Sequence, residues 1–184
     1  MQPGIFERYR APVELELRSL LDDQSLPIYH MMRYHLGWED AEGELIDGSG
    51  GKAFRPVICL FGCEAVGGDW RKALPGAAAL ELIHNFSLIH DDIEDGDIER
   101  RHRPTVWYLW GTSTAIAVGN AIRILAKLAV QRLLVNGFEA DKVLEIWAAI
   151  ESNSLDIIEG QFLDLDYESR LRVSVNDYLH MVSL

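Results

Sequence analysis

The sequence predicts an all-α protein whose helices pack as an antiparallel bundle around one core. Three observations support this prediction. Apolar residues recur at intervals of three and four along most of the chain, which places them on one face of a helix. Alternation of apolar and polar residues, the pattern of a half-buried strand, never persists. Apolar residues make up 48% of the 184 residues, enough for a sizeable core, so we expect residues 1–184 to form a single domain.

The expected elements follow in chain order from this periodicity and from its terminators. Prolines stand near the starts of three helical segments, at Pro27, Pro56 and Pro75, and glycines follow the ends of others. Ser174 and Asp177 form a capping-box pattern that opens the last helix. We expect helices at residues 5–21, 27–36, from about 56 to 67, 76–95, 112–135, 141–167 and from 175 onward. The segments 37–51 and 96–104 are expected to be loops.

Composition limits the kinds of partner that the chain can have. The formal net charge is −12 and no dense run of Lys and Arg is present, so we expect no nucleic-acid partner. Residues 1–10 lack the apolar segment of a signal peptide, and no uninterrupted apolar run approaches the ~18 residues of a membrane span. We therefore expect a cytoplasmic protein. Such an acidic chain needs a metal or a few well-placed cations to hold an anionic ligand.

Carboxylates gather at the end of the expected helix 76–95. Asp91 and Asp95 are four residues apart and point the same way, and His84 lies on the same stripe two turns earlier. Their mutual repulsion, close to the negative end of the helix dipole, is costly unless a cation offsets it. Oxygen ligands favour Mg²⁺, with Mn²⁺ as the other option. The alternatives are a solvated acidic helix end and, for His84, a core histidine.

Basic residues flank this acidic cluster in the sequence. Arg100, Arg101 and Arg103 follow it, and arginine suits bidentate contact with phosphate. Upstream, Lys52 and Arg55 stand beside two glycines at the start of a helix, where backbone N–H groups can meet an anion. The pattern indicates that anionic phosphate groups bind between the acidic and basic residues.

Three sequence elements resemble a known family. GGKAFRP (residues 50–56), ELIHNFSLIHDDIED with the following arginine pair (residues 81–101), and GQFLD (residues 160–164) occur in the order found in trans-type polyprenyl diphosphate synthases. The resemblance covers nearly the whole chain and is to the N-terminal part of such an enzyme. It implies a bundle of the isoprenoid synthase type. It also implies Mg²⁺-dependent head-to-tail condensation of isopentenyl diphosphate with an allylic diphosphate.

The resemblance also implies a role for each matching residue. Asp91 and Asp95 would bind Mg²⁺ and, through it, the allylic diphosphate, which Arg100 would also contact. The diphosphate of isopentenyl diphosphate would be bound by Lys52, Arg55, His84 and Arg101. The allylic site would be lined by Gln161 and Asp164. Phe86 and Ser87 would form the floor of the tail pocket and favour a C20 product, although plain core packing is the alternative for Phe86.

The chain also departs from the family pattern. His102 stands where a glycine usually follows the arginine pair, and Asn120 follows Gly119 where an aspartate is usual. The family's Lys-Thr element and second aspartate-rich motif would lie beyond Leu184, so we expect an N-terminal part that supplies one wall of an active site. A non-catalytic helical subunit that binds a diphosphate or a partner chain is the alternative. A terpene cyclase is disfavoured, because it does not need the second diphosphate site. The resemblance suggests a homodimer, or a partner chain that supplies the missing half.

Overall fold

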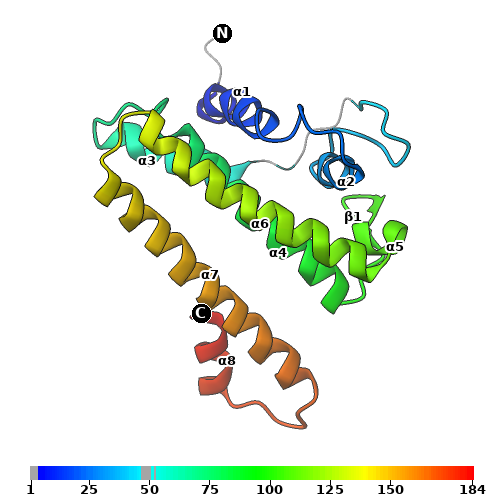
Figure 1. Ribbon diagram of the computed structural model, residues 1–184. Coiled ribbons are helices and arrows are strands. Elements are labelled where there is room, and N and C mark those ends of the chain that lie inside the picture. The colour runs from blue at the N-terminus through cyan, green and yellow to red at the C-terminus, as the bar shows by residue number, and fades with distance from the viewer. Residues whose placement is uncertain (1–3, 47–50, 52) are drawn as a thin grey trace. The chain divides into compact units, whose positions relative to one another are not determined.

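The computed structural model describes residues 4–46, 51 and 53–184, and this part of the chain contains eight α-helices (Figure 1). In chain order they are α1 Ile5–Arg18, α2 Pro27–His35, α3 Phe54–Ala65, α4 Leu74–Glu94, α5 Val106–Trp110, α6 Thr112–Val135, α7 Ala140–Glu168 and α8 Val175–Val182. The all-α prediction is confirmed. Contacts divide the chain into two compact units, residues 1–138 and 139–184, and each is described by itself. The single domain expected over residues 1–184 stays a prediction.

Most helix ends lie where the sequence signals place them. Both ends of α6 match the prediction, and the Ser174–Asp177 capping box opens α8 with both of its hydrogen bonds formed. α4 begins two residues earlier than predicted, because Pro75 lies in its first turn, where a missing N–H costs no helical hydrogen bond. α1 ends at Arg18 rather than at Leu21. The apolar pattern continues past the helix because the following turn also buries its leucines.

The expected loop 96–104 contains a short β-hairpin, which corrects that prediction. Strands β1 (Glu99–Arg100) and β2 (Arg103–Pro104) pair antiparallel, with Arg100 opposite Arg103. The two residues between them, Arg101 and His102, have φ of 55° and 62°, the left-handed backbone of a tight two-residue hairpin turn. Strands of two residues are too short to show alternation in the sequence. His102 thus adopts the backbone that glycine would adopt more readily, at a cost of about 1 kcal/mol.

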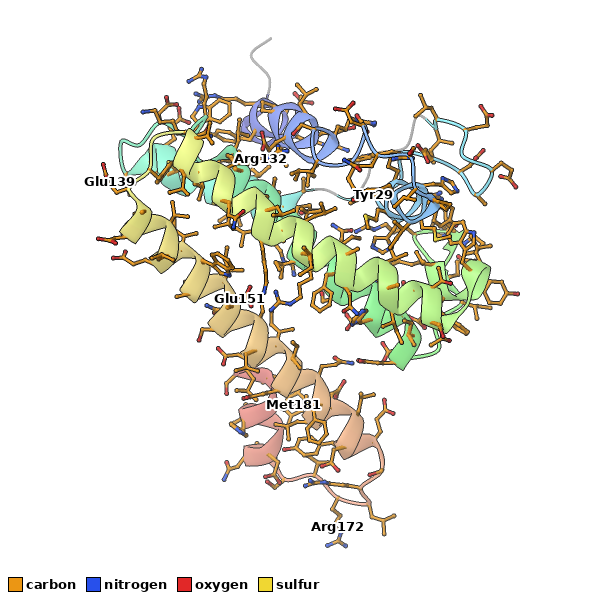
Figure 2. All side chains as sticks on the ribbon, in the orientation of Figure 1. Tyr29, Arg132, Glu139, Glu151, Arg172 and Met181 are labelled. Atoms are coloured by element: carbon orange, nitrogen blue, oxygen red, sulfur yellow. The ribbon has the colours of Figure 1, made fainter. Side chains whose placement is uncertain are left out.

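The core of the first unit lies between α4 and α6, which run antiparallel. Gly76 of α4 faces Leu133 of α6, and at the other end Gly119 of α6 faces His90 of α4. α1 and α3 pack against α4. Arg132 of α6, labelled in Figure 2, donates hydrogen bonds to the side chains of Glu16 and Ser19, and so ties α6 to the α1 segment.

α6 is also the one helix of the described residues that is long and apolar enough to cross a membrane. No such segment is expected from the sequence, in which no uninterrupted apolar run is that long. Its side chains at Val118, Ile122, Ala126 and Ala129 are buried in the first unit, where α6 packs along α4. This packing is that of a core helix.

The close approach of α6 to α4 depends on Gly119, so a larger residue at this position should destabilise the fold. A Cβ at this position would overlap the imidazole of His90, whose Nε2 is already buried. Gly119→Ala should therefore lower the free energy of unfolding by about 1–3 kcal/mol, measured by urea denaturation. The matched control is Gly62→Ala in α3, where a Cβ meets nothing, and which should stabilise the chain by about 0.5–1 kcal/mol. Equal effects of the two substitutions would contradict the packing role of Gly119.

The second unit consists of α7 and α8, which fold back on each other through the turn at residues 169–174 (Figure 1). They approach closely at Gly160 of α7, where a Cβ would lie 3.2 Å from the carbonyl oxygen of Met181. The glycine of the GQFLD element is therefore explained by the packing of α7 against α8.

Candidate active site

The acidic residues of the candidate site lie at the C-terminal end of α4. Asp95 is the C-cap, and its N–H donates to the carbonyl of Asp91 at 2.8 Å, so the helical turn continues through both aspartates. Burial and, next to it, the carboxylates of Glu94 and Asp95 together raise the pKa of the half-buried Asp91 to about 6. A divalent cation beside this carboxylate would reverse that effect.

The donor set of this helix end fits a metal that is only partly enclosed by protein. In the part of the chain that the structure describes, no three side chains of His, Cys, Asp or Glu converge closely enough to hold a metal ion by themselves. Mg²⁺ commonly keeps several waters and is bound through one or two carboxylates together with substrate phosphates. Asp91 and Asp95 can supply such a pair of carboxylates.

Three arginines act on the stripe of α4 that carries these aspartates. Burial and, to a smaller extent, the guanidinium groups of Arg55, Arg101 and Arg100 together lower the pKa of His84 to about 4. Arg100 also acts on Asp91, whose pKa it lowers against the larger effect of burial. The start of α3 and the β1–β2 hairpin therefore bring their cations to one face of α4. His84 is neutral at pH 7 and can donate a hydrogen bond without adding charge.

The hairpin meets the glycine turn before α3 through Arg101. A Cβ at Gly51 would lie 2.8 Å from the Nη2 atom of Arg101, so a larger residue there would require this guanidinium to shift. Gly51 and Arg101 line a pocket of about 40 Å³ together with Ala53, Glu81 and Asn85. Ala53, at the N-cap of α3, has a left-handed backbone with φ of 47°, a strained conformation for alanine.

Two charged residues have roles that sequence reasoning missed. Asp92 is buried, and its Oδ1 accepts a hydrogen bond of 2.5 Å from Nε of Arg100. Arg103 donates to the backbone carbonyls of Tyr34 and Glu39 at 2.9 and 2.6 Å and lies 4.0 Å from the centre of the Tyr34 ring, so it anchors the hairpin, whereas its expected contact with phosphate stays a prediction. The burial of Asp92 could have been predicted from the sequence, because its spacing from Asn85 and Glu81 places all three residues on one face of α4.

The other predicted site residues lie as follows. Lys52 lies outside the described residues. Gln161 is half-buried and Asp164 exposed on α7 of the second unit. Phe86 is buried, with its ring 4.8 Å from that of His90 and 5.7 Å from the guanidinium of Arg123 on α6. Ser87 donates a hydrogen bond to the carbonyl of His84 within α4. The roles of all five residues stay predictions.

The fold defines the class of the protein. The chain superposes on a crystal structure of a polyprenyl synthetase from Streptomyces coelicolor A3(2) with a TM-score of 0.86 and 41% identity, covering 96% of this chain and 51% of that one. A geranylgeranyl pyrophosphate synthetase from the archaeon Geoglobus acetivorans gives a TM-score of 0.83 at 34% identity, covering 97% of this chain and 54% of that one. The bundle is therefore of the isoprenoid synthase type, as the sequence analysis expected.

The sequence comparison gives the family. Residues 42–184 match the polyprenyl synthetase family, and the chain belongs to it. The chain is 38% identical over 178 residues to (2E,6E)-farnesyl diphosphate synthase of Mycobacterium tuberculosis strain H37Rv, covering 97% of this chain and 47% of the relative. It is also 38% identical over 180 residues to geranylgeranyl diphosphate synthase of the same organism, covering 98% of this chain and 50% of the relative. It thus spans about half the length of these relatives.

Proposed function

We propose that this chain forms the diphosphate-binding wall of a prenyl diphosphate synthase. The reaction would be the Mg²⁺-dependent head-to-tail condensation of isopentenyl diphosphate with an allylic diphosphate. One observation carries the proposal: two aspartates at the end of α4 share a stripe with His84, on which Arg55, Arg100 and Arg101 act, and Arg100 acts on Asp91 as well. A diphosphate carries enough negative charge to need both a metal and cations, and this arrangement offers both. The relatives named above act on substrates of this kind.

Each residue has a separate task in this proposal. Asp91 and Asp95 would hold Mg²⁺ or Mn²⁺, which when bound neutralises charge on the allylic diphosphate as it leaves. Arg100 would contact the same diphosphate. The diphosphate of isopentenyl diphosphate would be held by Arg55, Arg101, neutral His84 and Lys52. Because His84 is uncharged at pH 7, it would orient that group by hydrogen bonding and not by attraction between charges.

The finer predictions belong to the same proposal. Gln161 and Asp164 would line the allylic site. The buried ring of Phe86 and the small Ser87 would limit the prenyl tail, which favours a C20 product. We also propose a cytoplasmic setting, and a homodimer or a partner chain that supplies the rest of the active site.

The second candidate is a chain that binds a diphosphate without turnover. The chain spans about half the length of its relatives, so turnover by this chain is itself a proposal. Activity as a transferase and binding of a diphosphate are therefore measured separately.

The test compares pyrophosphate binding with transfer activity. Calorimetry should show binding of pyrophosphate that requires Mg²⁺, and Arg101→Gln should weaken it by about tenfold or more, because a hydrogen bond to a charged group is lost. Arg71→Gln is the matched control, since Arg71 is exposed on the turn before α4 and should not affect binding. Transfer of labelled isopentenyl diphosphate to an allylic diphosphate supports the enzyme. Binding without transfer supports the second candidate, and the absence of binding contradicts both.

A further inference from the structure

A buried polar stripe runs along α4 beside the candidate site. It consists of Glu81, Asn85 and Asp92, which are 7%, 1% and 1% exposed. Their spacing of four and seven residues places them on one face of the helix, next to the stripe that carries Asp91. Neighbouring helical residues point about 100° apart, so Asp92 faces the protein interior and not the helix face of Asp91. A buried carboxylate is costly unless a charged partner compensates it.

Asp92 has that partner on the hairpin. Its Oδ1 accepts the hydrogen bond from Nε of Arg100 at 2.5 Å, and the two side chains are 2% and 28% exposed. Hydrogen bonds between charged groups are strong where water is excluded. Within residues 4–46, 51 and 53–184, the two terminal nitrogens of Arg100 make no hydrogen bond. Among the described residues, the Arg100 guanidinium is therefore engaged through Nε alone.

Arg100 is held at both ends by these contacts. Its backbone is fixed by pairing with Arg103 across the hairpin, and its guanidinium is fixed by Asp92. A guanidinium is planar, so a hydrogen bond at Nε sets the plane of the whole group and leaves the terminal nitrogens as a fork for two phosphate oxygens. A side chain that is already ordered loses less conformational entropy when it binds a ligand.

We propose that Asp92 is a positioning residue, which orients Arg100 so that its terminal nitrogens bind the diphosphate held at the end of α4. The proposal rests on the proposed function. It separates the adjacent aspartates by role: Asp91 is directed to the metal, whereas Asp92 acts through the arginine. The acidic cluster of α4 then has two functions on two faces of the helix: metal binding on the face of Asp91, and orientation of Arg100 on the face of Asp92.

The test uses a double-mutant cycle on the affinity for pyrophosphate in the presence of Mg²⁺. Asp92→Asn keeps the shape of the side chain and removes its charge, and should weaken binding by about tenfold. Asp97→Asn is the matched control, because it removes the same charge from an exposed residue that follows the end of α4 and should leave affinity unchanged. If Asp92 acts through Arg100, Asp92→Asn should have little further effect once Arg100→Gln is present.

A spectroscopic signature tests the pairing without any ligand. In nitrogen–proton correlation spectra, the Nε–H signal of Arg100, assigned by its loss in Arg100→Gln, should exchange slowly with water in the unmodified chain. It should exchange about tenfold faster or more in Asp92→Asn, and be unchanged in Asp97→Asn. Fast exchange in the unmodified chain overturns the proposal even if Asp92→Asn does not fold.

The outcomes separate the two proposals. Slow exchange together with non-additive losses of affinity supports the positioning role. Additive losses, or full affinity in Asp92→Asn, overturn the positioning role and leave the proposed function intact. An unmodified chain that binds no pyrophosphate overturns the proposed function and the positioning role with it.

Discussion

Replacement of Asp91 by asparagine should abolish Mg²⁺-dependent binding of pyrophosphate and, in the absence of metal, should stabilise the fold. The first effect is expected because the amide has no charge with which to hold the cation that bridges to the phosphate. The second follows from the folded environment, in which burial and neighbouring carboxylates raise the pKa of Asp91 from 3.8 to about 6. At neutral pH the folded state must keep a charge that its surroundings disfavour.

The sign of the pH dependence follows from this shift. Between pH values near 4 and 6 the folded chain binds a proton on Asp91 that the unfolded chain has released, so the stability contributed by this residue falls as the pH rises through that window. The difference in unfolding free energy between Asp91→Asn and the unmodified chain should therefore be larger at about pH 7 than at about pH 4. Mg²⁺ with pyrophosphate should remove this advantage, because it stabilises only the chain that retains the carboxylate.

Urea denaturation at both pH values and calorimetry with Mg²⁺ and pyrophosphate measure these effects. Asp97→Asn serves as the control for loss of a nearby charge, because that exposed side chain lies outside the stripe of Asp91 and Asp95. Full Mg²⁺-dependent affinity in Asp91→Asn would remove the metal assignment. An unchanged stability in metal-free buffer would show that burial of Asp91 has no cost.

Helices could be predicted from the sequence because their signals are local. The spacing of three and four residues, the caps and the prolines lie within each segment, and they placed α6 and the start of α8 correctly. The shared stripe of His84, Asp91 and Asp95 follows from the same helical geometry. The family motifs then added a chemical interpretation that periodicity alone does not give.

Other features could not be predicted because they depend on contacts between distant parts of the chain. Arg103 bonds to carbonyls that lie 69 and 64 residues earlier in the sequence, and nothing in its own segment distinguishes it from Arg100. Similarly, Asp92 is adjacent to Asp91 and chemically identical to it, yet only one of them faces the interior. Composition groups residues by type, whereas tertiary contacts distinguish them: Asp92 is buried, and Arg103 donates to distant backbone carbonyls.

The role of Arg103 leads to the second large effect. Arg103→Ala should lower the free energy of unfolding by about 2–4 kcal/mol, because it removes two hydrogen bonds from a charged donor and a cation–π contact. The loss should reach the candidate site as well, since the hairpin that carries Arg100 and Arg101 is no longer held against Tyr34 and Glu39. Affinity for pyrophosphate should then fall although Arg103 does not touch the ligand.

Three variants distinguish anchoring from direct binding by Arg103. Arg103→Lys keeps the charge but cannot reach both carbonyls with one planar group, so it should recover little of the stability or affinity. Tyr34→Leu removes the ring under the guanidinium and the hydroxyl that donates to the carbonyl of Pro104, and it should reproduce part of both losses from the opposite side of the contact. Urea denaturation and calorimetry, carried out well below the melting temperature of each variant, measure the two effects. If Arg103→Ala unfolded at the same urea concentration as the unmodified chain but lost its affinity, Arg103 would be a ligand-binding residue after all, and the hairpin would be held by other contacts.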